Sequence, residues 1–467
     1  MLAKEDNDLL CQVGPGTPMG EMMRRYWIPA LYGWELEADD QPQRIRLLSE
    51  DLLVWRNTSG KIGVTQENCP HRGVSLYYGR NEEEGLRCCY HGWKFDTEGN
   101  CLEMPNEPSD SLFKGKVKIT AYQTAEAGGY VWIYMGEGAA PALPDFEFCA
   151  LPETHVRHSH KLVYEHNWMQ ALEGELDSTH VYFLHGRLSA ELPGKYGLWI
   201  DDKAARFHVV NTDYGLMYGA ERTEPEGTYW RTTQFIFPFY GMFPAVQNET
   251  LPMSIYVPID DEHTLHMGVN WNPNREITQN TPENLLGAPL PTEKGVLGGI
   301  GPMKEHQVGQ FFANWWPVVN KENDFHMDVE AKKTMSFTGI PGVRLQDSAV
   351  IYSMGKIMPR YREHLGTADA SIIRARRTLI AAAKALQESG TPPPASQEPE
   401  LYRVRQCETI LAPAQDWQTE LADWHHMRTD AYPNLEIMDK RWNSRGGDRT
   451  PRPQAAPAPE VVNSPGS

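Results

Sequence analysis

The sequence has no apolar run close to the ~18 residues that a membrane-spanning helix needs, and it has no long basic block. Its first residues are acidic and lack the basic and apolar regions of a signal peptide. The formal net charge of the 467 residues is −18, which leaves no source for the counterion release that drives nucleic-acid binding. We therefore expect a cytoplasmic protein whose partners include neither nucleic acid nor a membrane.

Cysteine is scarce and unevenly spread. The chain has seven cysteines, an odd number, and four of them gather between Cys69 and Cys101. Disulfide scaffolds use a dense and even set instead, so this cluster suggests a metal site in a reducing compartment. The fingerprints of flavin or pyridine-nucleotide binding and the four-cysteine spacing of a plant-type ferredoxin are also missing. Electrons for a redox reaction would have to come from a separate protein.

The order of predicted elements favours two domains, because a chain of this length exceeds what one hydrophobic core usually holds. A short helical lead-in over residues 1–40 precedes alternating runs, between about 44 and 137, that predict a small all-β domain. A helical pattern at 150–190, strands between about 205 and 270 and a later helix predict an α+β domain. The composition from residue 443 onward predicts a disordered tail.

The most specific motif combines Cys69 and His71 with Cys88 and His91, spaced as C-x-H and C-x-x-H. Two thiolates and two imidazoles are the ligand set of a Rieske [2Fe-2S] cluster. A structural zinc site uses the same residue types, but zinc fingers pair their cysteines in one half and their histidines in the other. Cys89 is a rival to Cys88, although only Cys88 gives the C-x-x-H spacing. The motif therefore favours a Rieske cluster.

A second group of candidate ligands follows at His180 and His185. An iron that activates dioxygen typically takes two histidines and one carboxylate. In a regular helix the two rings would lie about 140° apart around the axis, so we expect a π-bulge or a helix break between them. For the carboxylate we prefer Asp324, at an expected helix start, and keep Asp328, one turn later, as the alternative.

Several segments resemble the alpha subunits of Rieske non-haem iron ring-hydroxylating oxygenases: CPHRGVSLYYGR, CCYHGWKFDTEGNC and NWMQALEGELDSTHVYFLH. Electron-carrier Rieske proteins have an extra cysteine in each loop, where this chain has Val74 and Tyr90. The segments GPGTPMGEMMRRYWIPA and SFTGIPGVRLQDSAV are similar to the phthalate-dioxygenase branch. The resemblance implies an α+β protein with a small all-β Rieske [2Fe-2S] domain and a helix-grip-like catalytic domain built on an antiparallel sheet. We expect a lead-in at 1–40, these two domains at 41–148 and 149–442, and the tail at 443–467.

The resemblance also implies cofactors, partners and site residues. The cofactors would be the Rieske cluster and a mononuclear Fe(II), with NAD(P)H acting indirectly through a separate flavin-dependent reductase. His180 and His185 would bind the iron, and Asp177 would link it to the Rieske site of a neighbouring subunit in a homo-oligomer, either a trimer or a hexamer.

The expected activity is hydroxylation or dihydroxylation of an aromatic carboxylate, such as a phthalate or a substituted benzoate, in aromatic hydrocarbon catabolism. Arg206 and Arg231, on predicted strands, are candidate anchors for the substrate carboxylate. One alternative is a monooxygenase or demethylase of a methoxy- or N-methyl-aromatic. A non-enzyme alternative is an iron-sulfur electron-transfer protein, which would not need the second metal site.

Overall fold

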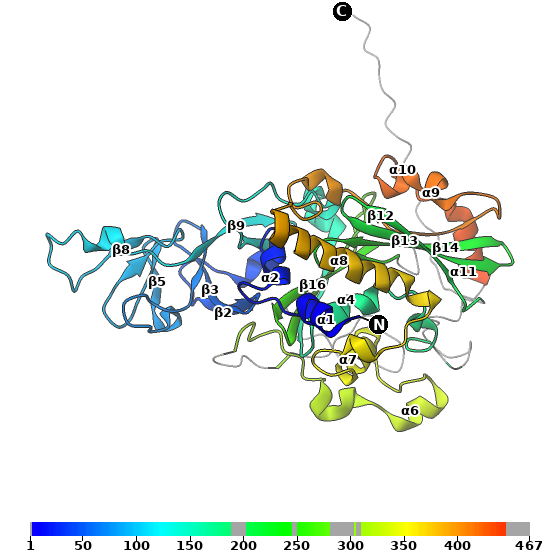
Figure 1. Cartoon of the computed structure of the whole chain (residues 1–467), viewed down its shortest axis with the longest axis horizontal. Coiled ribbons are helices and arrows are strands. Elements are labelled where there is room, and N and C mark those ends of the chain that lie inside the picture. Colours follow the sequence, from blue (N-terminus) through cyan, green and yellow to red (C-terminus); the bar gives the residue numbers. More distant parts are fainter. Residues whose placement is uncertain are drawn as a thin grey trace, which may run out of the picture.

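The computed structural model describes residues 2–186, 188, 202–244, 250–280, 303–304 and 310–444. It has a smaller β domain, on the left in Figure 1, and a larger domain of helices around a long antiparallel sheet. None of the helices in the described part of the chain is long and apolar enough to cross a membrane.

The chain begins with helices α1 (Lys4–Cys11) and α2 (Pro18–Met23), followed by the buried strand β1 (Trp27–Tyr32). Thr17 caps α2, because its Oγ1 accepts a hydrogen bond from Gly20 N at 3.2 Å. The helical prediction for residues 1–40 is thus correct for α1 and α2 and wrong for β1. Pairing with β10 decides the conformation of this segment, and such tertiary contacts override local spacing.

Two antiparallel sheets make up the β domain. The first has six strands, in the order β1, β10 (Tyr130–Tyr134), β9 (Ala121–Ala127), β4 (Ile62–Gln66), β3 (Glu50–Arg56) and β2 (Gln43–Leu47). The second has four short strands, β5 (Arg80–Glu82), β6 (Gly85–Arg87), β7 (Lys94–Phe95) and β8 (Cys101–Glu103). This four-stranded sheet lies at the end of the domain that is farther from the large sheet (Figure 1).

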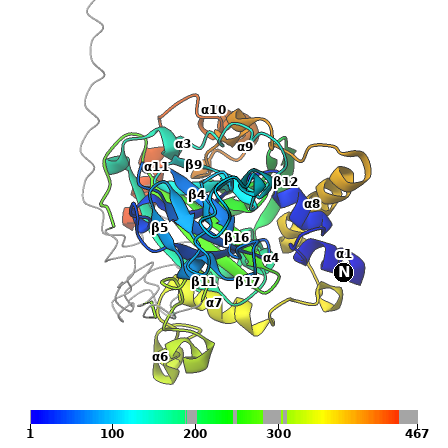
Figure 2. The ribbon, with the colours of Figure 1, turned by 90° about the vertical axis from the view of Figure 1, so that its left-hand side faces the viewer.

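The larger domain is organised by an eight-stranded antiparallel sheet. Its order is β11 (Val156–Tyr164), β17 (His263–Trp271), β16 (Leu251–Asp260), β15 (Tyr240–Met242), β14 (Gly227–Ile236), β13 (Gly215–Glu224) and β12 (Arg206–Thr212), with β18 (Cys407–Leu411) paired to β14. Strand β11 falls where a helical pattern was predicted, and its long pairing with β17 explains the difference. Figure 2 shows this sheet behind the β domain.

Helices surround this sheet. They are α3 (Glu147–Ala150), α4 (Trp168–Glu175), α6 (Val329–Thr334), α7 (Val343–Ser353), α8 (Ala370–Ser389), α9 (Trp417–Glu420), α10 (Ala422–His425) and α11 (Leu435–Ser444). Helix α8 contacts β12 and β13 and ends at Gly390, whose left-handed φ of +68° caps it. Helix α4 contacts β16 and also packs against α7. The predicted tail from residue 445 onward lies outside the described residues.

A buried ion pair and a surface ion pair join the two domains. Glu35, after β1, accepts from Lys161 Nζ of β11 at 2.6 Å and from Trp315 Nε1 at 2.6 Å, and its side chain is 3% exposed. Arg46 of β2 lies 3.1 Å from Asp260 at the end of β16. One hydrophobic core runs through both domains. Together these contacts hold the β domain in one orientation against the large sheet.

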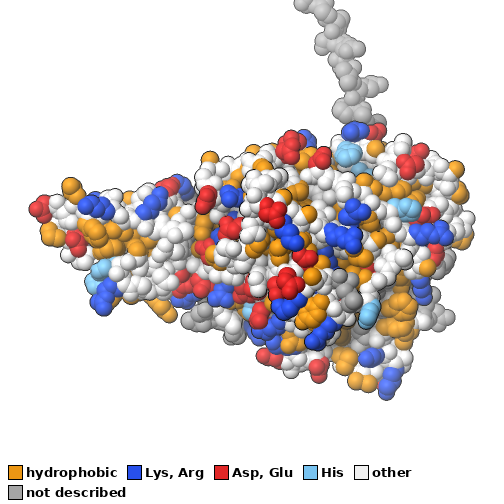
Figure 3. Space-filling model, viewed as in Figure 1, with side chains coloured by type: hydrophobic (Ala, Val, Ile, Leu, Met, Phe, Trp, Pro, Cys, Tyr) orange, Lys and Arg blue, Asp and Glu red, His pale blue; other side chains and the backbone are white. Residues whose placement is uncertain are grey.

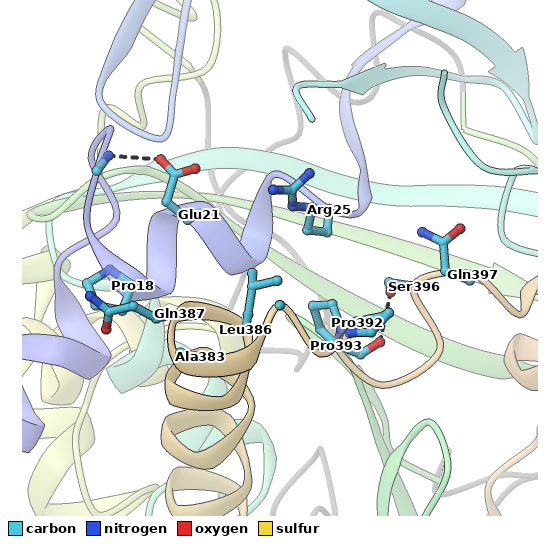
Figure 4. A pocket seen from close by; sticks show the side chains of 12 residues that line it. Pro18, Glu21, Arg25, Ala383, Leu386, Gln387, Pro392, Pro393, Ser396 and Gln397 are labelled. Carbon is cyan, nitrogen blue, oxygen red and sulfur yellow. Dashed lines mark hydrogen bonds between the residues drawn. The ribbon is translucent and has the colours of Figure 1, made fainter. Parts of the chain in front are cut away.

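The face shown in Figure 3 carries interspersed acidic and basic side chains over both domains. Surface ion pairs of this kind contribute little to stability individually. A surface pocket lies between α2 and the end of α8, where Figure 4 shows Glu21 accepting a backbone hydrogen bond from Gly16 at 2.8 Å. None of the site residues predicted from the sequence lines this pocket.

Candidate metal centres

Two loops of the β domain carry the first group of predicted ligands, and they share one backbone pattern. In the first loop Cys69 N donates to Val74 O at 2.9 Å, and Gly73 N donates to Cys69 O at 2.9 Å. Gly73 has a left-handed φ of +73°, which a residue with a Cβ rarely adopts. The second loop repeats both hydrogen bonds with Cys88, Gly92 and Trp93 in the same three places.

The four predicted side chains converge between these loops. Cys69 and Cys88 are buried, whereas Cys89 is exposed, so the structure offers Cys88 to the site. The ring centroids of His71 and His91 lie 4.4 Å apart. The Nδ1 atom of each ring is buried without a hydrogen-bond partner, which is costly unless another group binds it. Two thiols and two imidazoles with unpartnered nitrogens fit the ligand set of a Rieske cluster.

The protonation of one imidazole also suits a metal ligand. Desolvation and the neighbouring His71 lower the pKa of His91. This favours the neutral ring, the form that binds metals. The His71 ring stacks on Trp93 at 4.4 Å between centroids, and Trp93 Nε1 donates to Asn106 Oδ1 at 2.7 Å. The stacked indole therefore holds the His71 ring in place.

The second predicted site lies where helix α4 stops. After Glu175 the chain leaves the helix, and His180–Tyr182 form a short 3-10 turn, η5. His180 Nε2 and His185 Nε2 are 3.2 Å apart, so a helix break brings the two rings together, as the spacing had suggested. His185 Nδ1 donates to Gln346 Oε1 at 2.8 Å. Gln346 Nε2 in turn donates to Ile340 O at 2.8 Å, which orients the amide so that its Oε1 faces His185 Nδ1.

The carboxylate of this site belongs to Asp347, on α7. Its Oδ1 lies 3.1 Å from His185 Nε2 and 3.8 Å from His180 Nε2. One donor atom from each of the three residues lies within 4.8 Å of the others, an arrangement that could hold a metal ion. Burial opposes ionisation, but the two histidines lower the pKa of Asp347. Two imidazoles and one carboxylate match the ligand set of an oxygen-activating Fe(II).

The prediction of Asp324 as the carboxylate is therefore corrected, and Asp328 does not replace it. Among the described residues, the metal-binding group contains neither of them. Asp324 lies in the 3-10 segment η6 (Lys321–His326) with φ +48°. Asp328 caps α6, and its Oδ1 accepts from the backbone N atoms of Glu330 and Ala331 at 2.7 and 2.9 Å. The helix of this segment starts after Asp328, which is an ordinary cap, and not after Asp324. Asp347 lies in mid-helix within the segment SFTGIPGVRLQDSAV.

Comparison with known proteins agrees with both sites. Residues 26–123 match the Rieske [2Fe-2S] domain family, and residues 133–296 and 300–441 match the family described as LigXa C-terminal domain like. The phthalate 4,5-dioxygenase oxygenase subunit of Pseudomonas putida is 40% identical over 437 residues, which cover 90% of this chain and 94% of the relative. The chain belongs to the Rieske non-haem iron oxygenases. It is thus an enzyme, the oxygenase component of a multicomponent system, in the phthalate-dioxygenase-like branch.

Further comparisons support the same family and fold. The 3-chlorobenzoate-3,4-dioxygenase oxygenase subunit of Comamonas testosteroni is 39% identical over 427 residues, covering 90% of this chain and 98% of the relative. The oxygenase in the oxygenase–ferredoxin complex of carbazole 1,9a-dioxygenase has the same fold, with a TM-score of 0.51 at 18% identity over 84% of this chain and 97% of that one. The predicted α+β fold, with its β domain and antiparallel catalytic sheet, is confirmed. The cofactors of this Rieske oxygenase are a [2Fe-2S] cluster and a non-haem iron.

Asp177 lies next to the second site of this Rieske oxygenase. Its Oδ2 is 3.5 Å from His180 Nδ1, and its Oδ1 accepts from Thr179 N and Oγ1 at 2.7 and 2.6 Å. Burial opposes ionisation, but these contacts lower the pKa of Asp177 to about 2. The side chain is 25% exposed, so it can meet a group outside this chain. Buried Arg222, on β13, donates to Ser178 O at 2.9 Å and anchors this segment to the sheet.

The two arginines predicted to bind substrate are not placed like anchors. Arg206 is 77% exposed on the edge strand β12, with Nη1 3.9 Å from Glu221 Oε1. Arg231 is buried on β14, where its Nη1 lies 3.6 Å from Glu408 Oε2 of β18 and its Nη2 donates to Pro244 O at 3.3 Å. Arg206 therefore faces solvent, and the charge of Arg231 is already matched within the sheet.

Proposed function

We propose that this oxygenase hydroxylates or dihydroxylates an aromatic carboxylate, such as a phthalate or a substituted benzoate. The observation that carries the proposal is the group of His180, His185 and Asp347 in a chain that also presents the ligand set of a Rieske cluster. An electron-transfer protein would not need this group. The names of the two most similar relatives reported above, which specify phthalate and 3-chlorobenzoate, support the substrate class.

In this proposal each site residue has a definite role. Cys69, His71, Cys88 and His91 hold the Rieske cluster, and His180, His185 and Asp347 hold the mononuclear iron. When bound, the cluster would supply single electrons and the iron would supply open coordination positions for dioxygen. Gln346 keeps His185 in the tautomer whose Nε2 can bind a metal. Asp177 holds His180 from the other side of its ring.

Product analysis tests the activity. The purified holoenzyme, a surrogate reductase, NADH and ¹⁸O-labelled dioxygen would be incubated with phthalates, substituted benzoates and methoxy-aromatics, and the products analysed by mass spectrometry. Two labelled oxygen atoms in one ring product indicate dihydroxylation, one indicates monooxygenation, and a released one-carbon fragment indicates demethylation. The proposal predicts label in carboxylate products that is lost in His180→Ala. It fails if no aromatic carboxylate acquires label while the methoxy-aromatics react.

The electron donor is proposed to be a separate flavin-dependent reductase that takes hydride from NAD(P)H. The chain is further proposed to form a cyclic homo-oligomer, most simply a trimer, in which Asp177 of one subunit meets His91 of the next. The support is the partial exposure of Asp177 together with the placement of the two metal centres in different domains. Head-to-tail contacts that close a ring provide the required symmetry.

Mixed oligomers test electron transfer between subunits. Cys69→Ser disables the cluster and His185→Ala disables the mononuclear site, so each variant alone should be inactive. In randomly mixed trimers about three quarters of the assemblies contain both chains, and each has one productive junction of three, so about a quarter of wild-type turnover should return. If verified mixed trimers with the expected iron content show no activity above the separate variants, transfer between subunits is ruled out.

A further inference from the structure

Arg344, one helical turn before Asp347 on α7, has an environment unlike that of three other arginines inside the protein. Arg360, Arg376 and Arg405 each donate directly to a buried glutamate. Among the described residues, no carboxylate lies within 4.0 Å of the Arg344 guanidinium, and its Cζ lies over the Phe243 ring, 5.7 Å from the centroid. A guanidinium carries five N–H donors, and leaving them unpaired in a protein interior is costly.

The groups around Arg344 show where this cation lies. Its charge acts on the pKa values of Tyr164, Glu175, Tyr256 and Asp347, which come from β11, α4, β16 and α7. The guanidinium therefore lies within electrostatic range of the large sheet, of helix α4 and of Asp347, one of the three residues of the second metal site.

Burial disfavours the charged form of Arg344, and Glu175 is the carboxylate that opposes this most and raises the pKa of Arg344, but Glu175 is engaged elsewhere. Its Oε2 accepts from Tyr256 Oη at 2.7 Å, while its Oε1 is buried without a hydrogen-bond partner. Burial raises the pKa of Glu175 even though Arg344 opposes this. Among the described residues, no direct ion pair joins Glu175 to Arg344, and Glu175 Oε1 stays without a hydrogen-bond partner.

Arg344 and the metal site lie on the same face of α7. The side chains of His180 and Asp347 remain 24% and 21% exposed, and Arg344 is half-buried. Residues three positions apart on a helix share a face and differ by about 4.5 Å along the axis. The spacing of Arg344 and Asp347 is therefore within the reach of one small aromatic molecule.

We propose that Arg344 binds the carboxylate of the substrate and thereby orients the aromatic ring toward His180, His185 and Asp347. This inference rests on the proposed function, since it requires a substrate with a carboxylate. The guanidinium fork matches the two oxygens of a carboxylate, and such charge-assisted pairs are strong where water is partly excluded. Arg344 thus takes the role that the sequence had suggested for Arg206 and Arg231.

Equilibrium binding to the holoenzyme tests the role of Arg344. The probes are phthalate and 3-chlorobenzoate, each compared with its neutral amide, and Kd is measured calorimetrically without dioxygen. Arg344→Gln should weaken carboxylate binding by about 10- to 100-fold, the usual effect of losing a hydrogen-bonded charge pair, and change amide binding by less than about 3-fold. Arg344→Lys keeps the charge without the fork and should be intermediate. Arg206→Gln is the matched control and should leave all Kd values unchanged.

The selectivity for carboxylate over amide separates an anchor from a structural residue. Equal weakening of both probes in Arg344→Gln, or undiminished carboxylate binding, would overturn the inference and leave the proposed function intact. If the wild-type protein binds no aromatic carboxylate, the proposed function fails, and the role of Arg344 fails with it. If Arg344→Gln loses iron or unfolds, Arg344→Lys is used instead. Weaker binding of the carboxylate alone in Arg344→Lys supports the inference, and equal weakening of the carboxylate and the amide overturns it.

Discussion

Replacing Asp347 by alanine should empty the mononuclear iron site and leave the Rieske cluster intact. Asp347 contributes the only anionic donor of the group, because both histidines bind a metal as neutral rings. Removing an outer hydrogen-bond partner of a metal site already lowers metal affinity by about 10- to 100-fold. Loss of a direct ligand should cost at least about 100-fold, or about 3 kcal/mol.

The assay is the iron and sulfide content of the anaerobically purified protein. A cluster with two irons and one mononuclear site predict three irons per chain in the wild type and two in Asp347→Ala, with the sulfide content unchanged. The electron paramagnetic resonance of the reduced cluster should also be unchanged, and turnover should be lost. Asp347→Asn removes the charge but keeps the shape, so it should also lose iron.

Asp324→Ala and Asp328→Ala are the controls. Both should keep three irons per chain, since neither carboxylate belongs to the metal-binding group of the described residues. Asp328→Ala should lose about 1 kcal/mol of stability through its helix cap alone. An Asp347→Ala variant with three irons and normal turnover, or an Asp324→Ala variant that loses its third iron, would refute the assignment.

Two further predictions concern stability. Burial opposes ionisation, but histidine and arginine partners lower the pKa of Asp260 to about 2. This carboxylate therefore stabilises the fold above its unfolded pKa of 3.8, by about 1 kcal/mol at pH 7 because solvent screens the partly exposed group. Urea unfolding of Asp260→Asn should show that this free energy of unfolding is lost at pH 7 and that the loss is halved by about pH 3. A loss that does not depend on pH would contradict the reasoning. Glu173→Ala removes the carboxylate that pairs with buried Arg360 and one of the two that pair with Arg376, so it should lower the free energy of unfolding by about 3–5 kcal/mol. Glu330→Ala removes an exposed ion pair and should lower it by less than about 1 kcal/mol. Equal losses in the two variants would show that burial of the ion pair does not matter.

Features that depend on short stretches of chain could be read from the sequence. The Rieske ligands occupy two loops of six residues, each closed by its own hydrogen bonds and a left-handed glycine, so C-x-H and C-x-x-H already define the geometry. His180 and His185 are also close in sequence. Their spacing required a helix break, and the chain leaves α4 before it reaches them.

Features that depend on distant segments could not be read in this way. Local spacing suggested helix where β1 and β11 form, because strands are stabilised by partners that lie far away in the chain. The exposure of Arg206 and the ion pair of Arg231 with Glu408 likewise follow from the order of strands in the large sheet.

The amino-acid sequence by itself determined the family and predicted the four cluster ligands and the two histidines, since each is encoded in a continuous motif. Only the tertiary structure decided which carboxylate completes the second site. Asp347 lies far from His185 in the sequence, and the two side chains meet because α7 packs against α4. Asp324 and Asp328 are nearer to His185 in the sequence but, among the described residues, do not belong to the metal-binding group. The same packing places Arg344 beside the site. A metal ligand is defined by distances of a few ångströms between atoms, and no local propensity encodes a distance between helices.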